Sequence, residues 1–369
     1  MTSCWMSGGY GTMPSAQKLA GILIALRSLR TGWSKTVKRI LPNALKCWTV
    51  ATAFGLVVCG ALSTRAAEPE NGELDVVQVR PNFYMIAGAG GNIGVQIGSD
   101  GVVLVSAGAA AKTGEVSAAI KKLTNLPIRY VIDINADADF VGGNEKLAKS
   151  GFTIFTNALG NNGVAGTMTN GGAASILAHQ SILNRMSARD AKPSYPGDAW
   201  PTEAFLQNRK ALRMNDEGIE ILYQPAAHSD ADSFVLFRRS DVVVAGDVMD
   251  TTRFPVIDLA NGGSIQGEID ALNKLIDLTI APTPYIYKDV GTYVIPGHGR
   301  LSEQMEVVDY RDMVVLVRDV VADYIKQGKT LDQIKAAHPA LPYETRYGTQ
   351  PGVTNGFIET IYKSLTAKK

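Results

Sequence analysis

The stretch VIDINADADFVGGNEKLAKSG, Val131–Gly151, holds the clearest indication of how this chain folds. Its first residues end the apolar run IRYVIDI, which predicts a buried strand over 128–134. Three polar side chains follow at alternate positions, Asn135, Asp137 and Asp139. A glycine pair and the short helical pattern NEKLAKSG come next. A strand, a polar loop and a helix in this order predict a functional site at the end of the strand.

Three more predicted strands end in a histidine or an aspartate. His228 follows ILYQPAA, Asp247 follows VVVAG, and His298 follows TYVIP. Catalytic metal sites use histidine and carboxylate groups on loops that rigid strands bring together. We therefore expect one metal site built from five residues at four strand ends: Asp137, Asp139, His228, Asp247 and His298. The other histidines, His179 and His338, lie outside this pattern, and packing or solvated roles are expected for them.

Each of these five residues also has an ordinary structural explanation. Asp139 could cap the following helix, because aspartate is a good partner for a helix N-terminus. The two histidines could be buried and bonded to backbone, and Asp247 could accept from loop N–H groups. Burying all of them together without a cation is costly, and converging aspartates repel one another and raise at least one pKa. The pattern therefore predicts a bound cation or rebuilt surroundings.

The first 67 residues have a composition of their own. They contain no Asp or Glu but eight basic residues, and residues 48–62 are mostly apolar. The small residues Ala66 and Ala67 follow this apolar run. A basic region, a short apolar segment and a small-residue exit are typical of a secretory signal, so 1–67 is interpreted as a leader that is cleaved on export, with a periplasmic or otherwise secreted mature protein. An uncleaved N-terminal membrane anchor is the competing interpretation, although the apolar run is short for a spanning helix.

Removal of this leader changes the charge and the cysteine content. The whole chain has 369 residues, with 36 basic and 35 acidic side chains. Without the leader 28 basic residues face the same 35 acidic ones, a net charge near −7. All three cysteines lie in the leader, so the mature chain has no disulfide and no thiolate ligand. A mildly acidic chain lacks the electrostatic footprint of a nucleic-acid binder, and we also expect no stable membrane insertion after cleavage.

The mature chain divides into two further regions. Residues 74–302 contain two runs of predicted strands, each closed by helices, with a glycine-rich insert expected at about 157–215. Residues 303–369 have helical periodicity and form a predicted C-terminal helical extension. Two runs of strands with their own helices predict two stacked sheets covered by helices, an α/β fold.

The order of these motifs resembles the metallo-β-lactamase-fold hydrolase superfamily, and in particular its periplasmic members. The resemblance runs from about Val76 to Gly299. It rests on GGNIGVQIGSDGVVLV, PIRYVI before GGNEKLA, PAAHSDADSFVLF, AGDV, FPVIDLANGGSIQG and VIPGHG, in that order. The resemblance implies a four-layer αββα sandwich. It also implies a site that usually holds two zinc ions sharing an activated water.

The family's first metal loop reads His-x-His-x-Asp-His before Gly-Gly-Asn. With that frame placed on Gly142–Gly143–Asn144, the positions of its three histidines are taken by Asn135, Asp137 and Phe140. The family's remaining ligand positions match four residues that are kept: Asp139, His228, Asp247 and His298. A supporting aspartate of the family falls on Ser106. An amide is a poor zinc donor and a phenyl ring is none, so the motif is degenerate and a dinuclear zinc site is not expected.

Two functions stay open from the sequence. The first, narrowly favoured, is a protein with a degenerate metal site that lacks standard dinuclear zinc hydrolysis and acts as a binding or scaffold protein. The alternative is a hydrolase of ester, amide or lactam bonds with a single rebuilt site, in which Asp139 is the candidate catalytic residue. At most one divalent ion is expected, either zinc or a harder cation such as manganese, magnesium or calcium. Neither reading identifies the small-molecule substrate or ligand.

Overall fold

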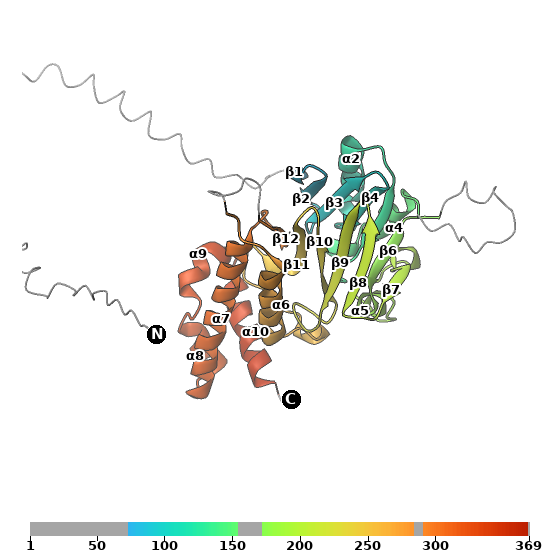
Figure 1. The fold of residues 1–369 in the computed structure, drawn as a ribbon. Helices are drawn as coiled ribbons and strands as arrows, with labels where there is room; N and C mark the ends of the chain where they lie inside the picture. Colours follow the sequence, from blue (N-terminus) through green and yellow to red (C-terminus); the bar gives the residue numbers. More distant parts are fainter. Residues whose placement is uncertain (1–72, 154–171, 284–290, 368–369) are drawn as a thin grey trace, which may run out of the picture. The chain divides into compact units, whose positions relative to one another are not determined.

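The computed structural model describes residues 73–153, 172–283 and 291–367. The predicted leader 1–67 lies outside these residues. Two β-sheets form the centre of the fold (Figure 1). The first sheet has the strands, in spatial order, β1 (Asp75–Arg80), β2 (Phe83–Ala87), β3 (Ile93–Gly98), β4 (Gly101–Val105), β5 (Ile128–Ile132), β6 (Ser175–His179) and β7 (Glu203–Phe205). The second has β12 (Tyr293–His298), β11 (Val242–Asp250), β10 (Asp232–Phe237), β9 (Glu217–Gln224) and β8 (Arg209–Met214).

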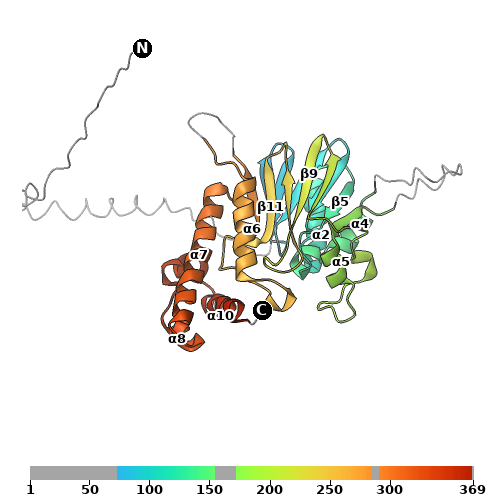
Figure 2. The same ribbon diagram turned by 60° about the horizontal axis from the view of Figure 1, so that its bottom comes forward.

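Helices lie on the outer faces of both sheets, as the view in Figure 2 shows. On the outer face of the first sheet these are α2 (Thr113–Leu123) and α4 (Asn144–Lys149). The short helices α3 (Ala138–Val141) and α5 (Gln180–Met186) follow β5 and β6 and contribute buried residues to the cluster between the sheets. On the side of the second sheet the helices are α6 (Ile265–Leu278), α7 (Gln304–Lys326), α8 (Leu331–Ala336), α9 (Glu344–Tyr347) and α10 (Val353–Thr366). Short 3-10 turns occur at η1 (Ala110–Lys112), η2 (Gly197–Ala199), η3 (Leu259–Asn261) and η4 (Leu341–Tyr343).

Three buried apolar clusters separate these four layers. One lies between the sheets and contains side chains such as Phe83, Phe140 and Phe237. Another joins the second sheet to α6, α7 and α10, and the third joins the first sheet to α2 and α4. Strand β4, whose two faces are both buried, is a continuous apolar run for this reason, and β5 departs from such a run only at Arg129. The predicted four-layer αββα sandwich is confirmed.

Local sequence signals explain where the long helices begin. The Ser264 hydroxyl accepts a hydrogen bond from the backbone of Gly267 at the start of α6. Glu303 and Glu306 form a reciprocal capping box at the start of α7. Such caps satisfy backbone donors that a helix N-terminus leaves without partners. The turn at Ser99–Gly101 joins the antiparallel strands β3 and β4 as a hairpin.

The strands that end at the predicted site run parallel to their neighbours. In the first sheet β4, β5, β6 and β7 are parallel, and in the second sheet β11 and β12 are parallel. Parallel strands present their carboxyl ends at one edge of a sheet. This topology brings the loops that follow β5, β11 and β12 to the same end of the sandwich.

The predicted insert at about 157–215 looks different in the structure. Residues 154–171 of the expected insert at 157–215 lie outside the described residues. The rest of that span forms β6, α5, β7 and β8, and both sheets include strands from it. Of its strands, β7 and β8 lie at sheet edges and β6 lies between β5 and β7, and all three are separated by polar or helical segments, which is why the sequence pattern resembles an insert.

The helical region after residue 303 is confirmed, and it belongs to the outer layer. Buried residues of α7 and α10, such as Val314 and Phe357, share one cluster with Leu272 of α6. The C-terminal helices therefore cover the second sheet. Within residues 73–153, 172–283 and 291–367, no helix has the length and apolar character needed to span a membrane.

Candidate metal centre

The five predicted site residues converge at one end of the sandwich. Asp137 precedes α3 and Asp139 lies in its first turn, His228 follows β9, Asp247 lies near the end of β11, and His298 ends β12. A small cavity of about 90 Å³ lies among them. Its lining consists of Asp137, Asp139, His228, Asp247, Asp250, Arg253 and Val256. The strand-end prediction therefore identified residues that are close together in space.

Three of these residues are close enough to share one ion. Asp137, His228 and Asp247 each offer a ligand atom, and these atoms lie within 4.8 Å of one another. The Nε2 atom of His228 lies 3.6 Å from Oδ2 of Asp137. We refer to Asp137, His228 and Asp247 as the metal triad. One imidazole and two carboxylates form a mixed nitrogen and oxygen donor set, which suits zinc or manganese.

The imidazole of His228 is held in place from its other side. Its Nδ1 atom lies 3.4 Å from Oδ1 of Asp232, and only 4% of the residue is exposed. Asp232 in turn accepts hydrogen bonds from the backbone N–H and the hydroxyl of Ser229. A carboxylate behind a histidine orients the ring and makes its outer nitrogen a better ligand. This arrangement is typical of a histidine that binds a metal.

His298 is engaged differently. Its Nε2 atom lies 3.2 Å from Oδ2 of Asp139 and 3.3 Å from Oδ1 of Asp247. The close approach of Asp247 depends on Gly297, because a Cβ there would lie 2.7 Å from Oδ1 of Asp247. The nitrogen that would face a second metal ion therefore faces two carboxylates directly.

Phe140 fills the volume beside His298. Its side chain is fully buried, and its ring meets the imidazole edge to face with 5.7 Å between centroids. Gly91, in the loop after β2, makes room for this ring, since a Cβ at Gly91 would lie 2.6 Å from it. The phenyl ring is thus packed against the imidazole and offers no donor atom there.

Asn135 has both ends of its amide engaged. Its Nδ2 donates to Oδ2 of Asp247 at 3.0 Å, and its Oδ1 accepts from the backbone N–H of Asp137 at 3.1 Å. It is also buried. Asn135 therefore holds two members of the metal triad in position, and both ends of its amide already have a hydrogen-bond partner.

The charges of the site perturb its titrating groups. Burial, with the nearby charges of Asp247 and Asp139, raises the pKa of Asp137 to about 6, although His228 and Arg185 oppose this. Burial disfavours the charged form of His228, but the carboxylates of Asp232, Asp247 and Asp137 outweigh it and raise its pKa to about 10. The pKa of Asp137 is thus raised mainly by burial, with a smaller part from the repulsion expected between converging aspartates.

His298 has a similar balance. Burial again opposes its charged form, yet Asp139 and Asp247 raise the pKa of His298 to about 10. The pKa of Asp139 is lowered, because the imidazole of His298 outweighs the effect of burial. Asp139 and His298 thus stabilise each other as an ion pair.

The ligand atoms of the site determine how many metal ions it could hold. A single divalent ion fits the metal triad, because its three ligand atoms already face one small cavity and one of them has a carboxylate behind it. Beside the triad, Phe140 has no donor atom and the Asn135 amide donates to Asp247. The His298 imidazole lies 3.2 Å from the carboxylate of Asp139 and 3.3 Å from that of Asp247.

Several residues around the site were missed by sequence reasoning. Asp232 lies behind His228, Asp250 and Arg253 line the cavity, and Arg185 lies near Asp137. The His-x-x-x-Asp spacing of 228 and 232 was a usable signal. The sequence carried no such signal for Arg185. Its helix precedes β7 and lies near the site only because of the tertiary fold.

The other two histidines lie outside the site, as expected. His179 ends β6, accepts from the backbone of Ser181 and stacks on Tyr223 at 3.7 Å between centroids. His338 is exposed and lies 3.8 Å from Glu344. The first packs and the second is solvated.

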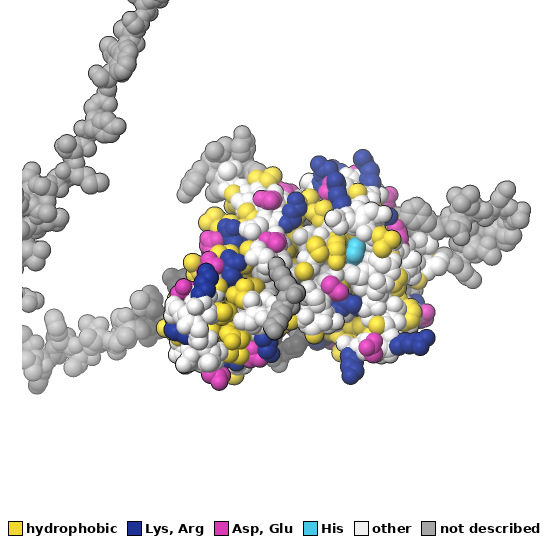
Figure 3. All heavy atoms as spheres, turned by 90° about the horizontal axis from the view of Figure 1, so that it is seen from below, with side chains coloured by type: hydrophobic (Ala, Val, Ile, Leu, Met, Phe, Trp, Pro, Cys, Tyr) yellow, Lys and Arg dark blue, Asp and Glu magenta, His cyan; other side chains and the backbone are white. Residues whose placement is uncertain are grey.

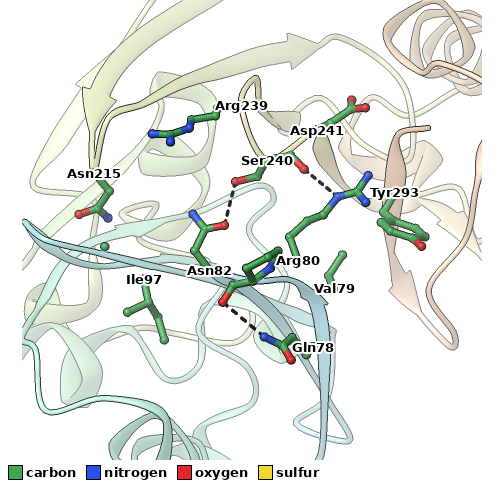
Figure 4. A pocket seen from close by; sticks show the side chains of 12 residues that line it. Gln78, Val79, Arg80, Asn82, Ile97, Asn215, Arg239, Ser240, Asp241 and Tyr293 are labelled. Atoms are coloured by element: carbon green, nitrogen blue, oxygen red, sulfur yellow. Dashed lines mark hydrogen bonds between the residues drawn. The ribbon is translucent and has the colours of Figure 1, made fainter. Parts of the chain in front are cut away.

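Another cavity, of about 970 Å³, lies away from the metal triad, and Figure 4 shows the side chains that line it. Asp241 lines it and precedes β11, whereas Asp247 lies near the far end of that strand. Arg80 in this cavity donates to the backbone oxygens of Ser240 and Gly291 and lies over the Tyr293 ring. Asp241 is the one carboxylate in its lining and accepts from Thr292. The cavity is large, but its charged groups are largely engaged in holding loops together.

Comparisons with known proteins show the fold. The stereoselective inverting sec-alkylsulfatase Pisa1 from Pseudomonas sp. has a TM-score of 0.56 and 14% sequence identity. The match covers 80% of this chain and 51% of the sulfatase, so this chain spans about half the length of that protein. A double mutant of the same sulfatase matches at 15% identity with the same TM-score and coverage. A metallo-β-lactamase from Pontibacter korlensis matches with a TM-score of 0.47, at 14% identity, over 66% of this chain and 99% of that one.

No protein-family model matches the sequence, and no curated protein matches it. The sulfatase similarity and the two facing sheets between helical layers show that the chain has the metallo-β-lactamase fold.

Proposed function

We propose that this protein is a hydrolase of the metallo-β-lactamase fold that works with one divalent ion and lacks dinuclear zinc chemistry. The observation that supports this most is the convergence of Asp137, His228 and Asp247 on one cavity, with Asp232 behind the histidine. A divalent ion in such a site acts as a Lewis acid and activates water for attack on an ester, amide or related bond. Because two of the three ligands are carboxylates, manganese is expected to bind as well as zinc.

The chain's own residues divide the remaining work. His228, Asp137 and Asp247 hold the ion, and Asn135 keeps Asp247 and the Asp137 backbone in position. Asp139 lines the same cavity and is the residue we assign to accept a proton from the attacking water. Its lowered pKa makes it a weak base, so a low turnover number is expected.

The substrate is proposed to be a small molecule. Without residues 1–67 the chain has a net charge near −7, and on the face in Figure 3 both acidic and basic side chains occur. Nucleic acid is therefore not proposed as a partner. We also propose export to the periplasm, with 1–67 as the cleaved leader, and an uncleaved N-terminal anchor is the alternative.

A non-catalytic binding protein is the second candidate, and a specific observation favours it. His298 is tied to Asp139 and Asp247, and Phe140 occupies the adjacent volume, so half of the family's catalytic arrangement is closed. In that case an ion in the metal triad would have a structural or ligand-binding role.

The test is metal content together with turnover. Purified protein is loaded with manganese or zinc, dialysed, and assayed for metal per chain and for hydrolysis of 4-nitrophenyl esters. We expect one ion per chain and slow, metal-dependent hydrolysis that the variant Asp247→Asn abolishes. One ion without any hydrolysis supports the binding protein. Two tightly held zinc ions would refute the single-ion site.

A further inference from the structure

A second cavity, of about 370 Å³, adjoins the metal triad and shares Asp137 with it. It lies between the loop after β5 and the segment around α5. The side chains that line it with polar or charged groups are Asp137, Arg185, Asp190, Lys192, Tyr195 and Asn261. This cavity has room for a small molecule whose reacting bond reaches the metal triad.

Arg185 is the cation at the junction of the two cavities. Its side chain is 18% exposed and lies among carboxylates from three separate loops, 3.9 Å from Asp137, 3.7 Å from Asp230 and 3.6 Å from Asp258. These distances balance charge but are longer than hydrogen bonds. The Nη1 atom is buried and has no hydrogen-bond partner among the described residues. A buried donor without a partner is costly. An acceptor that enters the cavity and bonds to Nη1 would therefore lower the free energy of the site.

We propose that this cavity binds an anionic group of the substrate, a carboxylate or a sulfate, through Arg185, beside the bond on which the metal triad acts. The guanidinium fits such groups because its planar N–H donors match two oxygens of an oxyanion. Lys192 adds a second positive charge at the rim of the cavity. The proposal rests on the proposed function, since it names the substrate class of the same site.

Asp137 links the two halves of this arrangement. Its Oδ2 atom faces His228, and its Oδ1 atom faces Nη2 of Arg185. One carboxylate therefore lies between the metal position and the anion position. The substrate should accordingly be short, with its anionic group a few bonds from the bond that is cleaved.

The surrounding carboxylates make anion binding depend on the metal. Without an ion, Asp137, Asp230 and Asp258 give the neighbourhood of Arg185 a negative charge that repels an anion. A divalent ion in the metal triad offsets the charge of Asp137 and Asp247. Metal and anion should therefore bind cooperatively, each raising the affinity for the other by the same factor.

The test compares monomethyl succinate with dimethyl succinate, which differ by one free carboxylate. Binding to the full chain loaded with manganese is measured by calorimetry, so the readout does not need turnover. We expect the monoester to bind at least about tenfold tighter than the diester, and Arg185→Gln to reduce this difference below about twofold. Arg185→Lys should retain part of it. Removal of manganese should weaken monoester binding about tenfold. Competition with sodium sulfate shows whether a sulfate binds better than a carboxylate.

Arg209→Gln is the control, because Arg209 pairs with Glu220 on an exposed surface outside both cavities and should behave as wild type. If Arg185→Gln fails to fold, the exposed Lys192→Gln variant serves instead, with an expected loss of about threefold. Equal affinity of the wild type for both esters, or full discrimination in Arg185→Gln, would overturn the proposal. An Arg185→Gln variant that loses metal but still prefers the monoester would show that Arg185 only holds Asp137. Discrimination without hydrolysis of either ester would refute the proposed hydrolase and leave the anion site standing.

Discussion

Asp137 and His298 occupy matching positions on either side of Asp247, yet their surroundings give them different roles. Asp137 faces a histidine that is oriented from behind by Asp232, whereas His298 faces two carboxylates. A side chain that already has strong partners is less available to an ion. The difference between the two halves of the site is therefore decided by individual neighbours and not by the backbone.

Replacing the two histidines separately should distinguish these roles. His228→Ala removes a direct ligand, and we expect manganese affinity to fall by more than about 100-fold, since losing only a supporting group costs 10–100-fold. His298→Ala should change the affinity by less than about tenfold. Titration against a chelating dye measures both. Equal losses in the two variants would mean that one ion is shared by both histidines.

Restoring the family's histidines should restore zinc. The variant Asn135→His, Asp137→His and Phe140→His supplies three donors on a backbone that already converges, and we expect clearly more zinc per chain than in wild type. Loss of the fully buried Phe140 ring should cost up to about 3–5 kcal/mol of the free energy of unfolding. Phe140→His alone is the control, with the loss of stability but little gain in zinc. An unchanged zinc content in the folded triple variant would contradict the alignment with the family motif.

At the level of elements, α6 carries an uncommon group. Glu268 is fully buried, and neither carboxylate oxygen has a hydrogen-bond partner among the described residues. Burial, the dominant effect, raises its pKa well above the usual value, with further contributions from Asp232 and Asp247. The folded state therefore binds this proton more tightly than the unfolded chain does.

This group should make stability depend on pH in a defined direction. Because the pKa is raised on folding, the contribution of Glu268 is most favourable below the unfolded value near 4.5 and is lost as pH rises. Glu268→Met has a similar size and no charge, so we expect it to raise the free energy of unfolding by about 1–3 kcal/mol at pH 8. The gain should be smaller at pH 5. Urea unfolding at both values measures it, and a gain that is larger at pH 5 would contradict the assignment.

Helix α10 is expected to be essential for the outer layer. Phe357 stacks on Phe254 with 5.1 Å between ring centroids and is almost fully buried. Phe357→Ala should lower the free energy of unfolding by about 3–5 kcal/mol. Leu365→Ala, at an exposed position of the same helix, should change it by less than about 0.5 kcal/mol. Similar values for the two variants would show that α10 does not pack as the structure has it.

The elements of the site could be predicted from sequence, because a strand end is visible as an apolar run that stops at a polar residue. His228, Asp247 and His298 were all found in this way. Phe140 was identifiable as a missing ligand, but the packing of its ring depends on Gly91, which is remote in sequence. Arg185 and Glu268 could not be found, because their importance comes from burial beside residues of other elements.

At the scale of the whole molecule, the layer order was predictable because two runs of strands each had their own helices. That residues 175–214 contribute strands to both sheets could not be predicted, because β6 and β7 are short and follow a glycine-rich segment. Short parallel strands depend on pairing partners more than on their own sequence. The coarse architecture therefore follows from periodicity, and the completion of its edges follows from tertiary contacts.

The predicted leader leads to a prediction for the mature protein. The buried clusters of the described residues begin at Val79, so removal of 1–67 deletes none of their members. We expect a chain that begins at Glu68 to retain the unfolding midpoint of the exported protein. N-terminal sequencing of the exported protein should give a start next to Ala66 or Ala67. A mature start before Trp48 would contradict cleavage at this place.

The position of α7 and α10 over the second sheet has a consequence for how the chain is made. Strand β12, which ends in His298, and the helices that cover the sheet all come from the last part of the sequence. While the chain is being synthesised, α6 can already pack on the second sheet, but the apolar surface that α7 and α10 cover stays exposed until these helices have emerged. Exposed apolar surface of this kind makes an incomplete chain prone to aggregation, so the last helices should also set when the folding chain becomes safe from it.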